Sequence, residues 1–184
     1  METEIKLEVD DPASTKRQLA KLGFAIVRRR VLEINTIFDT PESALLRARK
    51  LLRLRQAGSR RTLTFKGPPV ASRYKSREEI ESGFADDKAM RLILAGLGYK
   101  PVFRYEKYRT EFAQPGLAGA VMLDETPIGG FLELEGSPRW IERTARALGK
   151  SPVEYITASY GALYRKHCQA RGVTPGNMVF GRRR

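Results

Sequence analysis

Glu2-Thr3-Glu4-Ile5-Lys6-Leu7, at the start of the chain, is the stretch that decides the fold. Successive side chains of an extended strand point to opposite faces, so two carboxylates and one ammonium share one face. Ile5 and Leu7 take the other face. The stretch therefore predicts a strand whose apolar face needs cover and whose charged face needs water or a ligand.

Five later stretches place charged side chains on one face of a strand in the same way. A solvated face is the better explanation for any one of them alone. Six together favour a barrel whose apolar outer faces are covered by helices and whose inside is charged. Because buried ions lose hydration, such an interior gains little stability, and a ligand that satisfies both signs explains it better. The inward residues are Arg53 and Arg55 in 52–55, Lys66 in 63–66, Arg77, Glu79 and Glu81 in 73–83, Lys107 and Arg109 in 102–113, and Glu133 and Glu135 in 130–136.

Period-two patterning predicts eight strands, a number that suits a small closed barrel. The hairpin-length gaps between several of them favour antiparallel pairing, and the interleaved helices make the fold class α+β. The predicted strands are 2–9, 25–38, 51–57, 61–67, 73–83, 102–113, 119–125 and 130–136.

Capping residues predict the helices. The helix that starts near Asp86 should bury Met90, Ile93, Leu94 and Leu97. The expected helical stretches run from Asp11-Pro12 to Gly23, from Asp86 to Gly98, from Ser137-Pro138 to Gly149, and from Ser151-Pro152 to about Arg171 with a bend near Gly161, with a short one from Pro41 to about Lys50.

The length of 184 residues suits one domain with a real core, which we place at residues 1–172. We expect residues 173–184 to form a flexible basic tail that ends in three arginines.

Cys168 is the only cysteine, which rules out an intrachain disulfide and fits a reducing cytoplasm. The acidic start 1–4 is not a signal peptide, and no apolar run is long enough to span a bilayer.

The net charge of +13 predicts an anionic partner. Arg28-Arg29-Arg30 and the terminal arginines invite nucleic acid, but helix-turn-helix, zinc-finger and RNP-like patterns are all missing from the sequence. Basic residues that alternate along strands and mix with carboxylates are unlike a plain basic patch. Carboxylate oxygens suit Mg²⁺ or Mn²⁺, and Arg and Lys bind phosphate oxygens, so metal plus polyphosphate is the better complement.

These residues resemble the CYTH family, the triphosphate tunnel metalloenzymes, which include class IV adenylate cyclases, thiamine triphosphatases and inorganic triphosphatases. The ExExK pattern at Glu2–Lys6 is weak by itself, and the ordered series that follows makes the match strong over about residues 1–170. The further matching segments are 38–41 (FDTP), 52–55 (LRLR), 63–68 (LTFKGP), 76–81 (SREEIE), 123–124 (LD), 128–135 (IGGFLELE) and 159–160 (SY).

The resemblance implies an eight-stranded antiparallel tunnel that binds a triphosphate-bearing small molecule with Mg²⁺ or Mn²⁺. We expect a cytoplasmic monomer or homodimer with no membrane partner, and we consider nucleic acid an unlikely partner. The implied metal side comprises Glu2, Glu4, Glu79, Glu81, Glu133 and Glu135, with Asp124 on the same side or behind it. The implied triphosphate-binding residues are Lys6, Arg53, Arg55, Lys66, Arg77, Lys107 and Arg109, and the catalytic set is Glu2, Glu4, Lys6, Glu133 and Glu135.

Two reactions fit this site. Water can attack a terminal phosphorus, or a ribose hydroxyl can attack the α-phosphorus and release pyrophosphate, as in a class IV adenylate cyclase. We favour hydrolysis because water is always available, whereas cyclisation needs a specific ribose pose. A tunnel that binds polyphosphate without turnover and a nucleic-acid-binding module are the non-enzyme alternatives.

Overall fold

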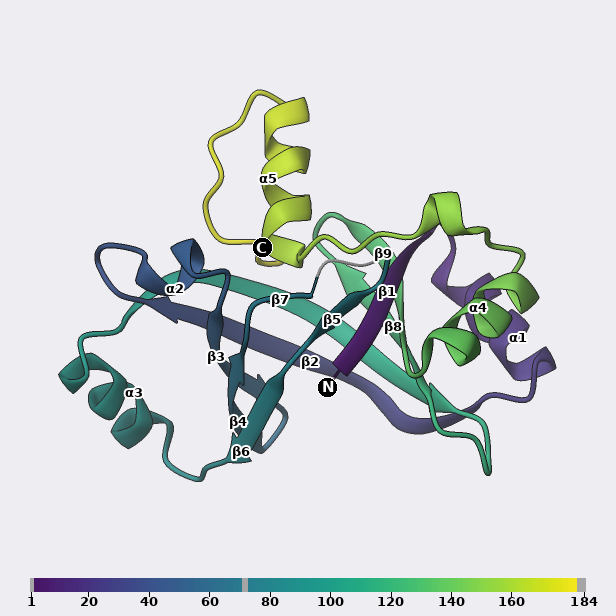
Figure 1. Ribbon diagram of the computed structural model, residues 1–184, viewed down its shortest axis with the longest axis horizontal. Coiled ribbons are helices and arrows are strands. Elements are labelled where there is room, and N and C mark those ends of the chain that lie inside the picture. Colours follow the sequence, from purple (N-terminus) through teal and green to yellow (C-terminus); the bar gives the residue numbers. More distant parts are fainter. Residues whose placement is uncertain (1, 71–72, 182–184) are drawn as a thin grey trace.

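Nine antiparallel strands form one strongly curved sheet in the computed structural model, which describes residues 2–70 and 73–181 (Figure 1). Their order across the sheet is β5-β1-β9-β8-β7-β2-β3-β4-β6. The sheet curls into a nearly closed barrel. Because its strands are antiparallel and helices lie between them in the chain, the α+β class is confirmed. The strands are β1 (Glu2–Val9), β2 (Ala25–Asp39), β3 (Leu51–Ala57), β4 (Arg60–Lys66), β5 (Lys75–Arg77), β6 (Glu79–Gly83), β7 (Lys100–Ala113), β8 (Ala120–Thr126) and β9 (Gly129–Glu135).

The two end strands of the sheet, β5 and β6, are separated by Glu78 alone. β5 pairs with β1, and β6 pairs with β4, so this interrupted segment connects β1 to β4 and closes the barrel. The sequence predicted one strand over 73–83 and eight strands in all. The structure has nine described strands, because the two halves of that segment pair with different neighbours.

Helices cover the outer face of the barrel, as the alternating pattern requires. α1 (Pro12–Lys21) and α4 (Pro138–Ala147) lie over one side of it (Figure 1). Their apolar residues join the outward residues of β1, β8 and β9 in one core, in which Ile5, Leu134 and Ile141 are fully buried. α3 (Asp87–Gly96) contributes Leu94 to a second core with Phe38 of β2. Among the described residues, no helix is long and apolar enough to span a membrane.

The helix boundaries differ from prediction in two places. α2 (Ala44–Arg47) is only four residues long. The predicted helix from Ser151 is a 3-10 turn at Pro152–Glu154, then an extended segment, then α5 (Tyr160–Ala170). The segment is extended because the backbone of Ile156 pairs with Lys6 of β1, with N–O distances of 2.8 and 2.9 Å.

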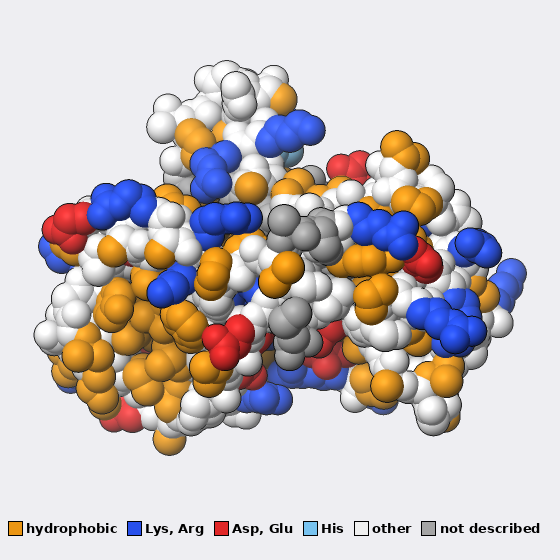
Figure 2. Space-filling view, viewed as in Figure 1, with side chains coloured by type: hydrophobic (Ala, Val, Ile, Leu, Met, Phe, Trp, Pro, Cys, Tyr) orange, Lys and Arg blue, Asp and Glu red, His pale blue; other side chains and the backbone are white. Residues whose placement is uncertain are grey.

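The apolar face of α3 is also narrower than predicted. Leu94 is 3% exposed and Met90 is half-buried, but Ile93 and Leu97 are 56% and 67% exposed. Only one stripe of this short helix reaches the barrel, so its remaining apolar side chains stay at the surface. Hydrophobic side chains accordingly gather on the α3 side of the molecule (Figure 2).

The C-terminal segment seals two strand edges that the barrel leaves open. Ile156 pairs with β1 beyond the reach of β5, which covers only Glu2–Glu4. Met178, which is fully buried, bonds to Arg104 and Glu106 of β7, where β8 does not extend. Residues 177–180, which belong to the segment 173–184 that we expect to be a flexible tail, therefore pack on the barrel. The terminal arginines 182–184 lie outside the described residues.

Candidate functional site

The inward faces of the strands surround a cavity of about 730 Å³. Every site residue predicted from the sequence lines this cavity, with the exception of Asp124. The structure thus brings together residues that are as far apart in the chain as Glu2 and Glu135. The predicted residues that line it are Glu2, Glu4, Lys6, Arg53, Arg55, Lys66, Arg77, Glu79, Glu81, Lys107, Arg109, Glu133 and Glu135.

An acidic group lies where β1 pairs with β9. Glu4 is opposite Glu135 in this pairing, and Lys6 is opposite Glu133. The Lys6 ammonium is 3.3 Å from a carboxylate oxygen of Glu4 and 3.3 Å from one of Glu133. Burial disfavours the ionised carboxylates, but the surrounding cations outweigh it and hold the pKa of both Glu4 and Glu133 below the usual range. Both groups are therefore anionic at neutral pH.

A second acidic group lies where the barrel closes. The Lys66 ammonium is 2.7 Å from Glu2 and 2.5 Å from Glu79. Burial and a hydrogen bond with Glu79 raise the pKa of Glu2 to about 7. Burial opposes ionisation of Glu79 as well, but the bond from Glu2 and the charge of Lys66 lower its pKa to about 2. The two carboxyl groups thus share a proton below neutral pH.

Asp124 of β8 lies behind the cavity wall, where it holds two of the cations that line the cavity. Its carboxylate accepts hydrogen bonds from Lys107 at 2.8 Å and from Arg109 at 2.7 and 2.6 Å. Tyr160, at the start of α5, donates a further hydrogen bond of 2.6 Å. Both oxygens are therefore engaged in a fully buried position. This arrangement fits a residue that positions Lys107 and Arg109 better than it fits a metal ligand.

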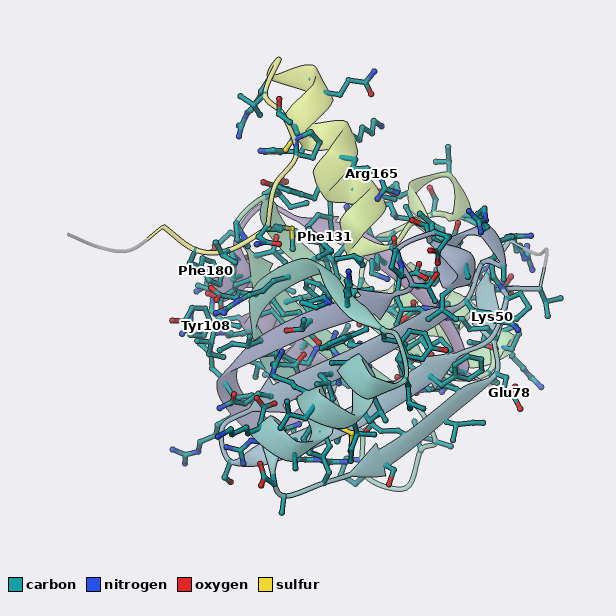
Figure 3. All side chains as sticks on the ribbon, turned by 90° about the vertical axis from the view of Figure 1, so that its left-hand side faces the viewer. Lys50, Glu78, Tyr108, Phe131, Arg165 and Phe180 are labelled. Carbon is teal, nitrogen blue, oxygen red and sulfur yellow. The ribbon has the colours of Figure 1, made fainter. Side chains whose placement is uncertain are left out.

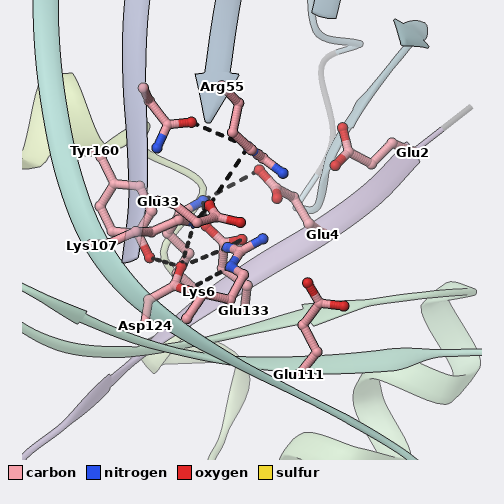
Figure 4. A network of polar contacts seen from close by, with 12 residues as sticks. Glu2, Glu4, Lys6, Glu33, Arg55, Lys107, Glu111, Asp124, Glu133 and Tyr160 are labelled. Carbon is pink, nitrogen blue, oxygen red and sulfur yellow. Dashed lines mark hydrogen bonds and ion pairs between the residues drawn. The ribbon is translucent and has the colours of Figure 1, made fainter. Parts of the chain in front are cut away.

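Several site residues were not named from the sequence. Lys75 lies 2.5 Å from Glu4, and burial lowers its pKa to about 8. Glu33 is fully buried at 3.6 Å from Arg55 and 3.7 Å from Lys107 (Figure 4). Tyr105 and Tyr160 line the cavity. Strand alternation could have identified Lys75, Glu33 and Tyr105. Tyr160 belongs to the segment 159–160 that matches the family, but no local pattern shows that its ring enters the barrel.

The carboxylates are neighbours, although they are turned toward lysines. Within the described residues, no three Asp, Glu, His or Cys side chains converge closely enough to hold a metal ion. Burial and the nearby charges of Glu4 and Glu133 nevertheless raise the pKa of Glu135. A divalent cation would relieve this repulsion, and carboxylate oxygens are its preferred ligands. The donor set at β1 and β9 therefore fits such an ion.

Buried donors without partners lie around the cavity, on β2, β3 and β5. Within the described residues, Nε of Arg53, Nε of Arg77 and Nδ2 of Asn35 have no hydrogen-bond acceptor. Arg77 also has no carboxylate within ion-pair distance in that part of the chain. Unpaired buried donors are costly, so an acceptor-rich anion in the cavity would stabilise them.

Comparisons with known proteins agree with this geometry. The model of the CYTH domain matches residues 1–160. A curated protein of Methanocaldococcus jannaschii, named as a proposed adenylate cyclase, is 33% identical over 74% of this chain and 77% of its own length. A Pyrococcus horikoshii structure superimposes with a TM-score of 0.77 at 22% identity, covering 91% of this chain and 99% of that one. A Hippeastrum structure gives 0.67 at 19% identity over 91% and 96%; its protein was proposed as an adenylyl cyclase and is described as having a dominant triphosphatase activity.

Proposed function

This chain belongs to the CYTH domain family, and from that premise we propose that it is a divalent-metal-dependent phosphohydrolase whose substrate carries a triphosphate. The observation that supports this most directly is the cavity itself. Its acidic side at β1 and β9 faces a basic side at β3 and β7. The barrel itself is stabilised by the apolar core between the outer faces of its strands and the helices. Metal and polyphosphate together would satisfy both sides.

The basic residues would bind and orient the phosphate chain. Lys107 and Arg109 are fixed by Asp124, so they would meet phosphate oxygens without first being ordered. Arg53, Arg55 and Arg77 present planar guanidinium groups that can bind phosphate with two hydrogen bonds each. Phosphoryl transfer depends mainly on such positioning and charge neutralisation.

Glu4, Glu133 and Glu135, with Glu2 beside them, would hold Mg²⁺ or Mn²⁺. A bound divalent ion supplies charge neutralisation at phosphate oxygens and lowers the pKa of a bound water. Lys6, between Glu4 and Glu133, would contact the phosphate chain on the metal side. The barrel wall excludes bulk water from most of this region, which strengthens each of these interactions.

Cyclisation of ATP is the second candidate, and the name of the Methanocaldococcus relative favours it. The same phosphate-binding residues would serve either reaction. Hydrolysis needs only a water at the phosphorus, whereas cyclisation also needs a fixed ribose. The Hippeastrum protein provides a precedent for hydrolysis on this fold.

The proposal is tested by incubating the protein with Mg²⁺ or Mn²⁺ and, separately, tripolyphosphate, thiamine triphosphate and ATP. Phosphate release supports the hydrolase, and cyclic AMP with an equal amount of pyrophosphate supports the cyclase. Glu133→Gln should lower turnover about 100-fold or more, because it removes a ligand of the metal that neutralises charge in the transition state. Glu8→Gln, on the same strand as Glu4 but exposed, is the control and should keep full activity. No product from any substrate would contradict the proposal.

Nucleic acid remains the weaker partner proposal. Two of the three arginines that suggested it are paired: Arg28 lies 3.1 Å from Glu111, and Arg30 lies 2.9 Å from Glu125. Paired arginines are less available to a phosphodiester backbone. A cytoplasmic monomer or homodimer stays our prediction for the assembly and location.

A further inference from the structure

The cavity wall changes character along two neighbouring strands. β7 presents Lys107, then Tyr105, then Phe103 to the cavity, and these lie opposite Glu33, Asn35 and Ile37 of β2. The charged pair is therefore deepest, and the apolar pair is four residues nearer the end of the barrel that α2 and α5 border. At about 3.3 Å per residue this change takes place over roughly 13 Å.

Further apolar side chains complete the outer part of the cavity. We name it the vestibule; its apolar lining residues are Ile37, Leu45, Leu46, Val102 and Phe103, with the backbone of Gly161 beside them. Leu46 is 64% exposed and Val102 is 54% exposed. An inorganic phosphate chain would gain nothing from contact with these groups, since its oxygens need donors or cations.

The vestibule is held in place by a buried carboxylate. Asp39, at the end of β2, is 5% exposed and accepts hydrogen bonds from the backbone N–H groups of Thr40, Leu45 and Leu46, at 2.8, 2.8 and 2.9 Å. These bonds fix α2 so that both leucines line the cavity. Charge-assisted bonds to backbone are among the stronger hydrogen bonds in proteins, so the apolar lining is a built feature of the fold.

We infer that the substrate carries a planar aromatic group on its triphosphate, as a nucleoside triphosphate does, and that the vestibule binds this group. The inference rests on the proposed function, because the phosphates must occupy the charged part of the cavity. Phe103 already stacks on Tyr105 and Tyr164, with ring centroids 5.9 and 6.1 Å apart, so its ring orientation is fixed before a ligand arrives. A flat ring would then pack between Phe103 and the leucines of α2.

Lys50 and Arg165 offer a competing explanation for the vestibule. Both line the cavity, Lys50 just before β3 and Arg165 on α5 (Figure 3). Among the described residues neither has an ion-pair partner, so the two could extend the phosphate-binding track. On that reading the protein would prefer long polyphosphate chains, and the apolar side chains between the cations would be incidental.

The experiment compares kcat/KM for ATP, tripolyphosphate and a longer polyphosphate. We expect ATP to exceed tripolyphosphate by at least about five-fold, the lower end of the effect of stacking one base. Leu46→Ser should lower this preference about three- to five-fold, mainly through the KM for ATP. Leu92→Ser is the matched control, because Leu92 has the same 64% exposure but lies on α3, outside the cavity. The control should leave the preference unchanged.

The outcomes separate this inference from the proposed function. Turnover of tripolyphosphate that equals or exceeds that of ATP would overturn the vestibule inference and leave the triphosphatase standing. A preference for long polyphosphate that is lost in Arg165→Gln would support the competing phosphate track. If no compound is turned over, calorimetry with ATP and with tripolyphosphate still tests the vestibule, since Leu46→Ser should weaken only the binding of ATP.

Discussion

The outer and inner faces of the barrel are built from alternate residues of the same strands, yet they have different roles. On β9, Leu132 and Leu134 pack under α4 at 3% and 0% exposure, while Glu133 between them is 6% exposed inside the barrel. Burial is nearly equal, so burial alone does not distinguish the two faces. The difference is in the partners: apolar groups outside, and opposite charges inside.

This contrast teaches where stability and function reside. Outward residues gain free energy by leaving water. Inward ions lose hydration, which costs free energy. Attraction between opposite charges offsets part of this cost, as it does for Lys6 between Glu4 and Glu133. Such an interior contributes little net stability, and its value lies in an anion and a cation that it can bind.

Asp124→Asn tests whether one inner-face carboxylate contributes to stability, which would make it an exception to this contrast. Asp124 lies on the inner face but holds Lys107, Arg109 and Tyr160. Removing one partner from a buried ion network costs about 3–5 kcal/mol, so we expect this loss in urea unfolding. Glu135→Gln is the control: burial and its acidic neighbours already disfavour its charge, so it should change stability by less than about 1 kcal/mol. Equal effects of the two variants would show that inner carboxylates are interchangeable.

Leu134→Ala sharpens the contrast from the outer side. Leu134 is fully buried in the core under α4, so truncation should lower the free energy of unfolding by about 2–5 kcal/mol. Below the unfolding temperature, the variant should keep most of its activity, because Leu134 faces away from the cavity. Ile80→Ala, at a side chain that is 58% exposed, should change stability by less than about 0.5 kcal/mol. A stable but inactive Leu134→Ala protein would contradict the division between the faces.

The pH dependence of stability in metal-free protein gives a smaller effect. The pKa of Glu2 is raised from 4.5 to about 7 in the folded state, so the folded protein binds the extra proton. Stability is then lost as pH rises from about 4.5 through 7. The effect is reduced by the 16% exposure of this side chain. Thermal unfolding between pH 5 and 8 should show the decline in wild type, and Glu2→Gln should flatten it; an unchanged slope in the variant would assign the decline elsewhere.

Arg30→Ala should have the smallest effect. Arg30 is 45% exposed, pairs with Glu125 and stacks at 3.5 Å on Tyr108. Exposed pairs of this kind contribute about 0–1 kcal/mol, so the loss should stay within that range. Arg29→Ala, at an exposed neighbouring position, is the comparison. A loss well above that of Arg29→Ala would mean that the outer surface relies on charge more than we propose.

Most of the barrel could be predicted from alternation alone. Period-two patterning places Arg53 and Arg55 on one face whatever the pairing, because the period of a strand is fixed by backbone geometry. Caps likewise locate α1, whose N-cap Asp11 accepts hydrogen bonds from Ala13 and Ser14. The helix predicted from Ser151 to about Arg171 was wrong before Tyr160, since tertiary pairing of Ile156 with Lys6 overrides a local helical preference.

The sequence by itself determined which residues share a face, where most strands and helices lie, and most of the charged side chains that line the cavity. Only the tertiary structure decided that Asp124 lies behind Lys107 and Arg109, that α5 inserts Tyr160 into the barrel, and that α2 lines an apolar vestibule. The physical reason is range: alternation and capping act over a few residues. These three features depend on contacts between elements that are distant in the chain, and no local pattern records such contacts.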